Sequence, residues 1–531
     1  MVRTLELVKG GKQNVSTSGV DVNATVVPVF YEAVSLTETD ELLENGETSP
    51  NTCTNPEETS LKLDSNPSKN VYIPHSTIEE ARKYTAIVVP SVLVSLMWYL
   101  QWTISAMYAG NHLGVEALSG LSLANLSGNI LGKSLIFGML SAYDTLAPQA
   151  FGSRDYREVG YLTQRSFAIG MVLSVITAFV WWNMGSLLTV LGQPHSAVSL
   201  ASWFLKIAIL YLPSDLVAEL CKRFLAIQNV VYPFVLIQSV TVCFHYLYLR
   251  VFVSHWGFAG LAMAHVSSSY TAMILALFYV KILLPHKKET WPPLNLREAM
   301  RFSQVIDYLK LGIPGIFSMG EWWYWEIICF FAGRVGPVAL EAHSIGYNLI
   351  PLAFMIPLGI QIASIIRTGT LLAEGNVKLA EKVALVSTFL SIFVGIIHAF
   401  LTFVLRDHII RSFTSDTETI VMCNKIWNWI CAFLVVDSVL GVVGGILRGL
   451  GKQIVLSIAL TVCLWILGLP CTYLIVFKYE GGLLALWQSM VGQYILLDIV
   501  ILVIVYLHNF SQTSRNIQEK HKHGNIVQPH G

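Results

Sequence analysis

Charged side chains are scarce in this chain. Asp, Glu, Lys and Arg make up 13% of its 531 residues, which is about half the usual quarter for a soluble domain. Hydrophobic residues make up 54%. This composition excludes an ordinary soluble domain and predicts a polytopic membrane protein that sits in a lipid bilayer. The formal net charge is zero, so no excess of basic residues favours nucleic acid as a partner.

The sequence also lacks the motifs of metal sites, disulfide frameworks and intramembrane enzymes. Its eight cysteines are scattered, and no two of them form a CxxC pair. We therefore expect no bound metal and no cofactor. Neither GxGD nor HExxH occurs, so the sequence predicts a protein that is not an enzyme. The first apolar span begins only after residue 82, so we expect no cleaved signal peptide.

Residues 1–82 differ in composition from the rest of the chain. They are rich in Ser, Thr and Asn and hold 13 acidic against 6 basic residues. This pattern predicts a disordered cytosolic tail. Within it, Glu38 to Leu43 has the spacing of an acidic dileucine sorting signal. A chance match in a tail that contains Glu and Leu is the alternative.

Twelve apolar spans follow, and each is long enough to cross a bilayer as a helix. They cover residues 84–109, 117–142, 161–183, 196–220, 227–253, 257–284, 309–333, 339–366, 380–405, 425–448, 453–477 and 482–507. With the N-terminus inside, the cytosolic loops hold 16 Lys and Arg and the opposite loops six. This bias places both termini in the cytosol. The polar linker 285–308 divides a first lobe, residues 83–284, from a second lobe, residues 309–507, and a cytosolic tail, 508–531, follows.

The two lobes repeat one another. The matched pairs are Pro90 with Pro314, Trp98 with Trp322, Gly114 with Gly336 and Ser122 with Ser344. The first two pairs are each 224 residues apart, and the others follow after single-residue gaps. An even number of spans per repeat gives parallel lobes related by an axis along the membrane normal. The sequence thus predicts an all-α membrane protein of twelve transmembrane helices in two parallel six-helix repeats.

The span LGIPGIFSMGEWWYWEIICFFAG, residues 311–333, carries two acids. Glu321 lies 11 residues from Lys310 and 13 from Arg334, so it falls near the middle of the membrane. A carboxylate at that depth costs several kcal/mol unless it faces a protein interior, a water cavity or a partner. Glu326 lies about 7.5 Å nearer the predicted outer face. It is either a vestibule residue or a structural hydrogen-bond acceptor.

A second acid at the same depth is Asp437, which lies 12 residues from Lys425 and 11 from Arg448. Gly441 and Gly444 follow on its helical face, where they allow a neighbouring helix to come close. One lobe therefore holds two acids at one depth, on its first and fourth helices. Such a pair can take up and release protons in the physiological range. A pair of protonated acids hydrogen-bonded in the core is the alternative.

Aromatic side chains surround Glu321 in the sequence. Phe317, Tyr324 and Trp325 share its helical face by their spacing, and Trp322 is its neighbour. An aromatic wall beside a carboxylate favours organic cations through cation–π contacts. Ordinary packing is the alternative for each of these rings.

Asp215, Glu219, Lys206 and Asp498 also fall within apolar spans. Asp215 and Glu219 lie within two turns of Lys222 and Arg223, so we expect them near the membrane interface. Lys206 is expected to extend its ammonium to the interface. Asp498 lies in the middle of the last span, where a structural role in the core and a role in coupling are both open.

Taken in order, five motifs resemble the multidrug and toxin extrusion (MATE) family of eukaryotic type. They are NHLG at 111–114, SAYDTLAPQAFGS at 141–153, GEWWYWE at 320–326, MIPLG at 355–359 and GGILRGLGKQ at 444–453. The resemblance covers roughly residues 80–507. It implies a central cleft between the lobes, with Glu321 and Asp437 as the functional acids and Glu326 as a further acid of animal members.

The chain departs from the animal pattern at Asn348, where animal transporters carry a glutamate. We expect Asn348 to line the substrate cleft with the aromatic residues. The resemblance also assigns structural or gating roles to Asp144, Thr145 and Gln149 at a cytosolic helix end. Pro90 is a candidate gating residue because it can kink the first helix.

The resemblance implies a secondary active antiporter that works by alternating access. It would export organic cations, xenobiotics or metabolites in exchange for protons. Sodium coupling, organic-anion export and flipping of lipid-linked oligosaccharides are the alternatives. We expect a monomer in the plasma membrane or in a vacuolar or endolysosomal membrane, with a small organic molecule as substrate.

Overall fold

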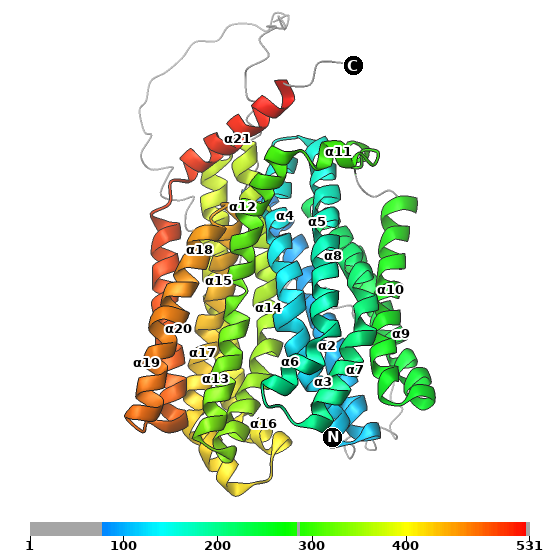
Figure 1. The fold of residues 1–531 in the computed structure, drawn as a ribbon. Coiled ribbons are helices and arrows are strands. Elements are labelled where there is room, and N and C mark those ends of the chain that lie inside the picture. The colour runs from blue at the N-terminus through cyan, green and yellow to red at the C-terminus, as the bar shows by residue number, and fades with distance from the viewer. Residues whose placement is uncertain (1–76, 284–286, 527–531) are drawn as a thin grey trace, which may run out of the picture. The chain divides into compact units, whose positions relative to one another are not determined.

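A computed structural model describes residues 77–283 and 287–526 of the chain. The Glu38–Leu43 motif and residues 1–76 of the predicted tail lie outside the described residues. From Arg82 onward the chain forms one compact unit, and that unit is described here by itself. Every regular element in the described residues is a helix, as an all-α fold requires (Figure 1).

The first lobe contains six membrane-crossing segments, several of them built from consecutive helical pieces. In chain order the elements are α2 (Thr77–Leu113), α3 (Val115–Gly128), η2 (Asn129–Lys133), α4 (Ser134–Gly152), α5 (Tyr156–Trp182), α6 (Met184–Val190), α7 (His195–Ala208), η3 (Ile209–Tyr211), α8 (Leu212–Ile227), α9 (Tyr232–Trp256) and α10 (Phe258–Ile282). The pieces α3, η2 and α4 make up the second segment, and α7, η3 and α8 make up the fourth.

The second lobe follows a linker that contains two short helices, η4 (Lys288–Thr290) and α11 (Leu296–Ala299). Its elements are α12 (Phe302–Ser318), α13 (Gly320–Val335), α14 (Pro337–Glu374), α15 (Val377–Val404), α16 (Arg406–Phe413), α17 (Thr417–Gly449), α18 (Gln453–Leu460), η5 (Thr461–Gly468), α19 (Leu469–Tyr473), η6 (Leu474–Lys478), α20 (Gly482–Tyr506) and α21 (Phe510–Ile526). Pieces α12 and α13 form its first segment, and α18 through η6 form its fifth.

The predicted spans agree with these helices to within a few residues at most ends. Within the described residues, ten helical stretches are long and apolar enough to cross a membrane. The segments α3–η2–α4 and α12–α13 are each broken into shorter pieces, and adding them gives the predicted twelve. Six ends extend seven to ten residues beyond the predicted spans: the starts of α2, α12 and α17 and the ends of α4, α8 and α14. Helix α2 begins at Thr77, so residues 77–82 are helical and not part of a disordered tail.

The predicted repeat is visible in the backbone at Gly114 and Gly336. Each residue precedes the second segment of its lobe and has a positive φ, 90° at Gly114 and 153° at Gly336. Side chains other than glycine rarely adopt that region. The two lobes therefore turn between their first and second segments with the same residue type at matched positions.

The lobes meet along α4, which packs against α12, α14 and α17 near the middle of Figure 1. Glycine makes this contact close. A Cβ atom on Gly138 would lie 2.5 Å from the Cα of Ile316, and one on Gly152 would lie 2.4 Å from the carbonyl oxygen of Thr370. Glycine-lined contacts of this kind bring backbones together in membrane proteins.

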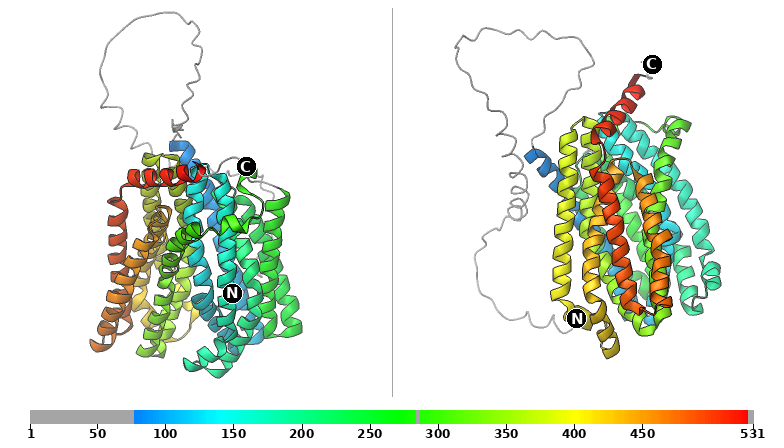
Figure 2. Two further views of the ribbon diagram at one scale, coloured as in Figure 1. Left: turned by 45° about the horizontal axis from the view of Figure 1, so that its top comes forward. Right: turned by 90° about the vertical axis from the view of Figure 1, so that its left-hand side faces the viewer.

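Helix α21 contacts both lobes at the end where α4 meets α14. Ser514 Oγ donates a hydrogen bond to the carbonyl oxygen of Leu372 in the second lobe, at 2.6 Å. Lys520 pairs with Asp307 of α12 at 3.0 Å, and His521 Nδ1 lies 3.4 Å from Asp155 Oδ2 at the start of α5 in the first lobe. Figure 2 shows α21, in red, lying across the ends of other helices.

Candidate functional site: an acidic cluster in the second lobe

The helix that carries Glu321 is broken immediately before that residue. Pro314 lies inside α12, which ends at Ser318, and α13 starts at Gly320. Proline removes a backbone donor and disturbs the turn that precedes it. The break puts Glu321 in the first turn of α13, where free N–H groups and the helix dipole stabilise an anion by about 0.3–1 kcal/mol.

Asp437 is buried on α17, which packs against α14, α15 and α20. The glycines after it produce close contacts, as the sequence indicated. A Cβ on Gly441 would lie 2.6 Å from the ring of Phe354, and one on Gly445 would lie 2.7 Å from Gln361 Cγ. Gly444, by contrast, faces Leu456 at an ordinary distance. Gly441 and Gly445 thus bring α14 against the face of α17 that begins at Asp437.

A third acid joins this pair. Asp498 of α20 is buried, and it interacts electrostatically with both Glu321 and Asp437. Its Oδ1 atom has no hydrogen-bond partner among the described residues. In the sequence, the one sign that Asp498 could be functional was its position in the middle of an apolar span. The sequence alone could not show that α20 lies beside α13 and α17, and so the role of this acid stayed open.

Two residues of α20 connect the cluster to the surrounding helices. Tyr494 donates a hydrogen bond from Oη to Glu321 Oε1 at 3.1 Å. Gln493 accepts one from Tyr324 Oη at 2.5 Å and donates to the carbonyl oxygen of Gly468 at 3.0 Å. These bonds tie α13, α20 and η5 together and hold the Glu321 carboxylate in one orientation. Neither Tyr494 nor Gln493 was predicted, because an aromatic or amide residue in an apolar span carries no distinctive pattern.

One cation faces the acids. Arg448, at the end of α17, interacts electrostatically with Glu321 and with Asp144 of the first lobe. Its Nη2 lies 3.4 Å from Ser318 Oγ, and its Nε has no hydrogen-bond partner among the described residues. Arg448 lies eleven residues after Asp437, which puts it on the same helical face. Three acids against one arginine leave the cluster with an excess of negative charge when it is ionised.

The predicted aromatic wall divides into buried and exposed residues. Tyr324 is 0% exposed, and Trp325 packs its ring against Phe433 with centroids 4.9 Å apart. Both rings fill the helix interface and do not line an open cleft in this conformation, because their faces are covered by α17 and α20. Phe317 is 57% exposed and Trp322 is 41% exposed, so these two remain accessible.

Glu326 and Asn348 lie apart from the three acids in their described contacts. Glu326 accepts a hydrogen bond from Tyr347 Oη at 2.7 Å, which is the structural arrangement that the sequence left as one of two alternatives. Asn348 is exposed, and its backbone carbonyl oxygen accepts a hydrogen bond from the Tyr99 hydroxyl of α2 at 3.2 Å. Asn348 therefore lies where the two lobes face one another.

The four residues with predicted gating or structural roles lie on α2 and α4. Thr145 Oγ1 donates to the carbonyl oxygen of Arg448 at 2.7 Å, and Gln149 Nε2 donates to that of Gly449 at 3.2 Å. Both bonds join the lobes. Asp144 accepts from Arg223 Nε at 2.9 Å within the first lobe. Pro90 is buried inside α2, which continues through it as one helix.

The architecture and the site define a class: a membrane transporter of two repeated six-helix lobes, with buried acids in one lobe and hydrogen bonds between the lobes at one end. The MatE family profile matches residues 90–248 and residues 315–474, one match in each lobe. The chain belongs to the MatE family of membrane transporters.

Relatives and solved structures agree with this membership. Multidrug and toxin extrusion protein 1 of Xenopus tropicalis is 29% identical over 457 residues, which cover 85% of this chain and 78% of that protein. Multidrug and toxin extrusion protein 2 of Mus musculus is 30% identical over 427 residues, covering 78% and 72%. The crystal structure of the eukaryotic MATE transporter AtDTX14 shares the fold, with a TM-score of 0.78 at 22% identity, over 84% of this chain and 99% of that chain.

Proposed function

We propose that the protein is a secondary active antiporter that exports organic cations in exchange for protons. Relatives named multidrug and toxin extrusion proteins support efflux of organic compounds. The observation that supports a cationic substrate and a coupled proton is the cluster of Glu321, Asp437 and Asp498. Their three helices bring three carboxyl groups together against a single nearby arginine.

The chemistry of the cluster suits exchange. Three carboxylates so close together repel one another, and the repulsion is relieved when a proton or an organic cation binds. Only one of these two needs to be present at a time, which is the requirement for an exchanger. Glu321 is the acid best suited to the organic cation, because the exposed rings of Phe317 and Trp322 flank it in the sequence.

Alternating access would use the contact between the lobes. The hydrogen bonds from Thr145 and Gln149 to the end of α17 support a closed gate at this end. Arg448 connects the gate to the site, since it interacts electrostatically with Glu321 while its carbonyl oxygen accepts the bond from Thr145. Binding of a proton or a cation at Glu321 would weaken that interaction and favour opening.

The test is substrate flux in vesicles that contain the purified protein, under imposed proton and sodium gradients in separate arms. We expect a fluorescent organic cation to accumulate against its gradient when the proton gradient is imposed. Glu321→Gln should lose this accumulation and also bind the cation more weakly. Accumulation that follows the sodium gradient alone would replace the proton with sodium, and no accumulation under either gradient would reject antiport.

An organic anion is the second candidate substrate, and Asn348 favours it. The backbone of this residue contacts the other lobe, and its neutral side-chain amide donates to the carbonyl oxygen of Ser344 in the same helix. The cleft therefore holds one negative charge fewer than with glutamate at this position. Competition between a cation and a citrate-like anion of matched size separates the two candidates. Asn348→Glu should then increase the preference for the cation, because it adds a carboxylate to the cleft.

A further inference from the structure

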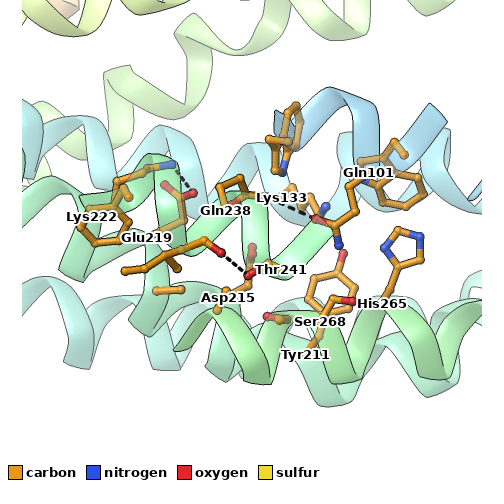
Figure 3. A pocket seen from close by; sticks show the side chains of 17 residues that line it. Gln101, Lys133, Tyr211, Asp215, Glu219, Lys222, Gln238, Thr241, His265 and Ser268 are labelled. Carbon is orange, nitrogen blue, oxygen red and sulfur yellow. Dashed lines mark hydrogen bonds and ion pairs between the residues drawn. The ribbon is translucent and has the colours of Figure 1, made fainter. Parts of the chain in front are cut away.

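A second polar site lies in the first lobe, where two apolar clusters of that lobe meet. Its cavity has a volume of about 80 Å³ and is lined by Tyr211 from one cluster and by Phe234 and Ile237 from the other. Both charged and neutral polar side chains point into it (Figure 3). A volume of this size holds roughly half a dozen water molecules or a small organic molecule.

Lys133 is the buried cation of this cavity. It closes η2, a π-helical turn between α3 and α4 in which Leu131 departs from helical geometry. Such turns are frequent at functional sites. The side chain is 7% exposed, and its Nζ lies 5.0 Å from the ring centroid of Trp102 and 5.2 Å from that of Tyr211. Within the described residues this ammonium has no hydrogen bond and no ion pair, so all its donors are available to a guest.

Asp215 of α8 is the matching anion. It lines the same cavity and interacts electrostatically with Lys133, but no ion pair within 4 Å joins them. Its neighbour Glu219 behaves differently, since it pairs with both Lys222 and Arg223. The sequence grouped Asp215 with Glu219 at the membrane interface. The structure instead leaves Asp215 facing the cavity, because it lies one helical turn before the residue that takes up both cations.

Neutral hydrogen-bonding groups fix the rest of the wall. Ser105 Oγ lies 2.7 Å from His245 Nε2 and 3.0 Å from His265 Nε2, and His245 Nδ1 lies 2.8 Å from Ser268 Oγ. These buried side chains therefore satisfy one another. Lys133 and Asp215 are the charged groups of the wall that remain without a direct partner in the described residues, and they carry opposite signs.

We infer that this cavity binds a small zwitterion, with the carboxylate of the guest on Lys133 Nζ and its cationic nitrogen toward Asp215. A simple anion would meet the Asp215 carboxylate, and a simple cation would meet the Lys133 ammonium. A zwitterion satisfies both groups at once, and the rings of Trp98 and Trp102 offer faces for a methylated nitrogen. The site shares no residue with the acidic cluster, so it does not depend on the proposed antiport.

The experiment uses three probes of nearly equal size and the purified full-length protein in nanodiscs. Glycine betaine is the zwitterion, choline lacks its carboxylate, and 3,3-dimethylbutyrate lacks its positive charge. Equilibrium binding is measured by dialysis or calorimetry. We expect glycine betaine to bind at least about tenfold more tightly than either of the others. Choline loses the charged hydrogen bond from Lys133, and 3,3-dimethylbutyrate loses the attraction of its nitrogen to the Asp215 carboxylate.

Variants then locate the site. Lys133→Met and Asp215→Asn should each weaken binding of glycine betaine at least about tenfold. The matched control is Lys206→Met, which removes an exposed lysine of the same lobe that also lies over an aromatic ring, Trp182, at 5.6 Å. It should leave binding of glycine betaine unchanged, as should Asp307→Asn, which changes an exposed acid of the other lobe. The comparison of the three probes on the unchanged protein needs no variant to fold.

Other outcomes overturn the inference in distinguishable ways. If choline binds the Lys133→Met variant more tightly than it binds the unchanged protein, the cavity is a cation site whose ligand is repelled by the Lys133 ammonium. Equal binding of glycine betaine and dimethylbutyrate would show a plain anion site. A protein that binds none of the probes would show that the cavity holds water only.

Discussion

In the first lobe the buried charges occur in compensating groups, whereas the second lobe keeps three acids against one arginine. Arg223 pairs with Asp144 and Glu219, and Lys133 faces Asp215 across a cavity. In the second lobe Arg448 is the one cation among the described residues that interacts with the acidic cluster. One fold repeated twice therefore carries two electrostatic designs. Because an excess of acids favours the binding of a cation, the proposed exchange rests on the second lobe and the proposed zwitterion site on the first.

Among the substitutions that would test this difference between the lobes, we expect the largest effect from a change at Asp437. Asp437→Asn keeps the shape of the side chain but removes its ionisation. We expect uphill accumulation of an organic cation under a proton gradient to fall to the level of vesicles without protein, while the melting temperature is unchanged or higher. Asp437 has no hydrogen bond or ion pair among the described residues, and removing a buried charge of this kind does not cost stability. Accumulation at the wild-type level would move the coupling site elsewhere.

Asp498→Asn should have a smaller effect on the same measurement. The structure brings this acid into the cluster, so we expect proton-driven accumulation to decrease by roughly tenfold, the effect of about 1.4 kcal/mol. Asp307→Asn is the control, since Asp307 is an exposed acid that pairs with Lys310 and Lys520. Identical transport by Asp498→Asn and the unchanged protein would assign Asp498 to the structural core.

In the first lobe, neutralising an acid should lower the free energy of unfolding while leaving proton-coupled transport intact. Asp144→Asn removes one anion from Arg223 and leaves it with Glu219. We expect a loss of about 1–3 kcal/mol in the free energy of unfolding, seen as a lower melting temperature, with proton coupling retained in the folded fraction. A variant that is as stable as the unchanged protein but uncoupled would extend the exchange site into the first lobe.

The contact between the lobes gives a steric test. Gly138→Ala would place a Cβ 2.5 Å from the backbone of Ile316, so α4 and α12 would have to move apart. We expect a cost of about 1–3 kcal/mol, as for overpacked cores, with a lower melting temperature and slower transport. The control is Gly492→Ala on α20, where a Cβ would meet nothing within 4 Å. Equal effects of the two substitutions would contradict a close contact at Gly138.

The smallest expected effect is at the gate. Thr145→Val removes the hydroxyl that donates to the carbonyl oxygen of Arg448 and contacts Gln453. Each lost hydrogen bond is worth about 0.5–1.5 kcal/mol, so the closed state should become less populated without unfolding. The measurement is the reaction rate of a cysteine introduced at Lys452, three residues beyond the packed Gly449, with a membrane-impermeant thiol reagent, compared with and without Thr145→Val. An unchanged rate would show that this bond does not hold the gate.

The spans and the repeat could be predicted because each depends on local composition. A run of apolar residues sets a helix in a membrane whatever surrounds it, and matched Pro, Trp and Gly positions record the repeat. Glu321 and Asp437 could be predicted for the same reason, since an acid in an apolar span stands out. Pro314 is the sequence signal for the broken helix before Glu321, since proline disturbs the turn that precedes it.

What could not be predicted depends on how helices meet. Tyr324 lies on the expected face of its helix, but the sequence could not show that α20 would bury it. Asp498 was recognisable as an acid in an apolar span, but the sequence did not show which helices would pack beside it. Lys133 was not singled out, although a lysine in the apolar span 117–142 stands out as an acid does. The π-helical turn before it has no clear signal in the residues Asn129 to Lys133, so its inward position could not be predicted.

The helix at the end of the chain has a practical consequence for anyone who purifies this protein. Since α21 holds Leu372 of one lobe and approaches Asp155 of the other, a load attached beyond it pulls on both lobes together. A bulky fusion partner there would bias which side of the membrane the cleft opens to. Transport rates measured on such a fusion would then include an effect of the fusion partner. A short cleavable tag is the safer choice.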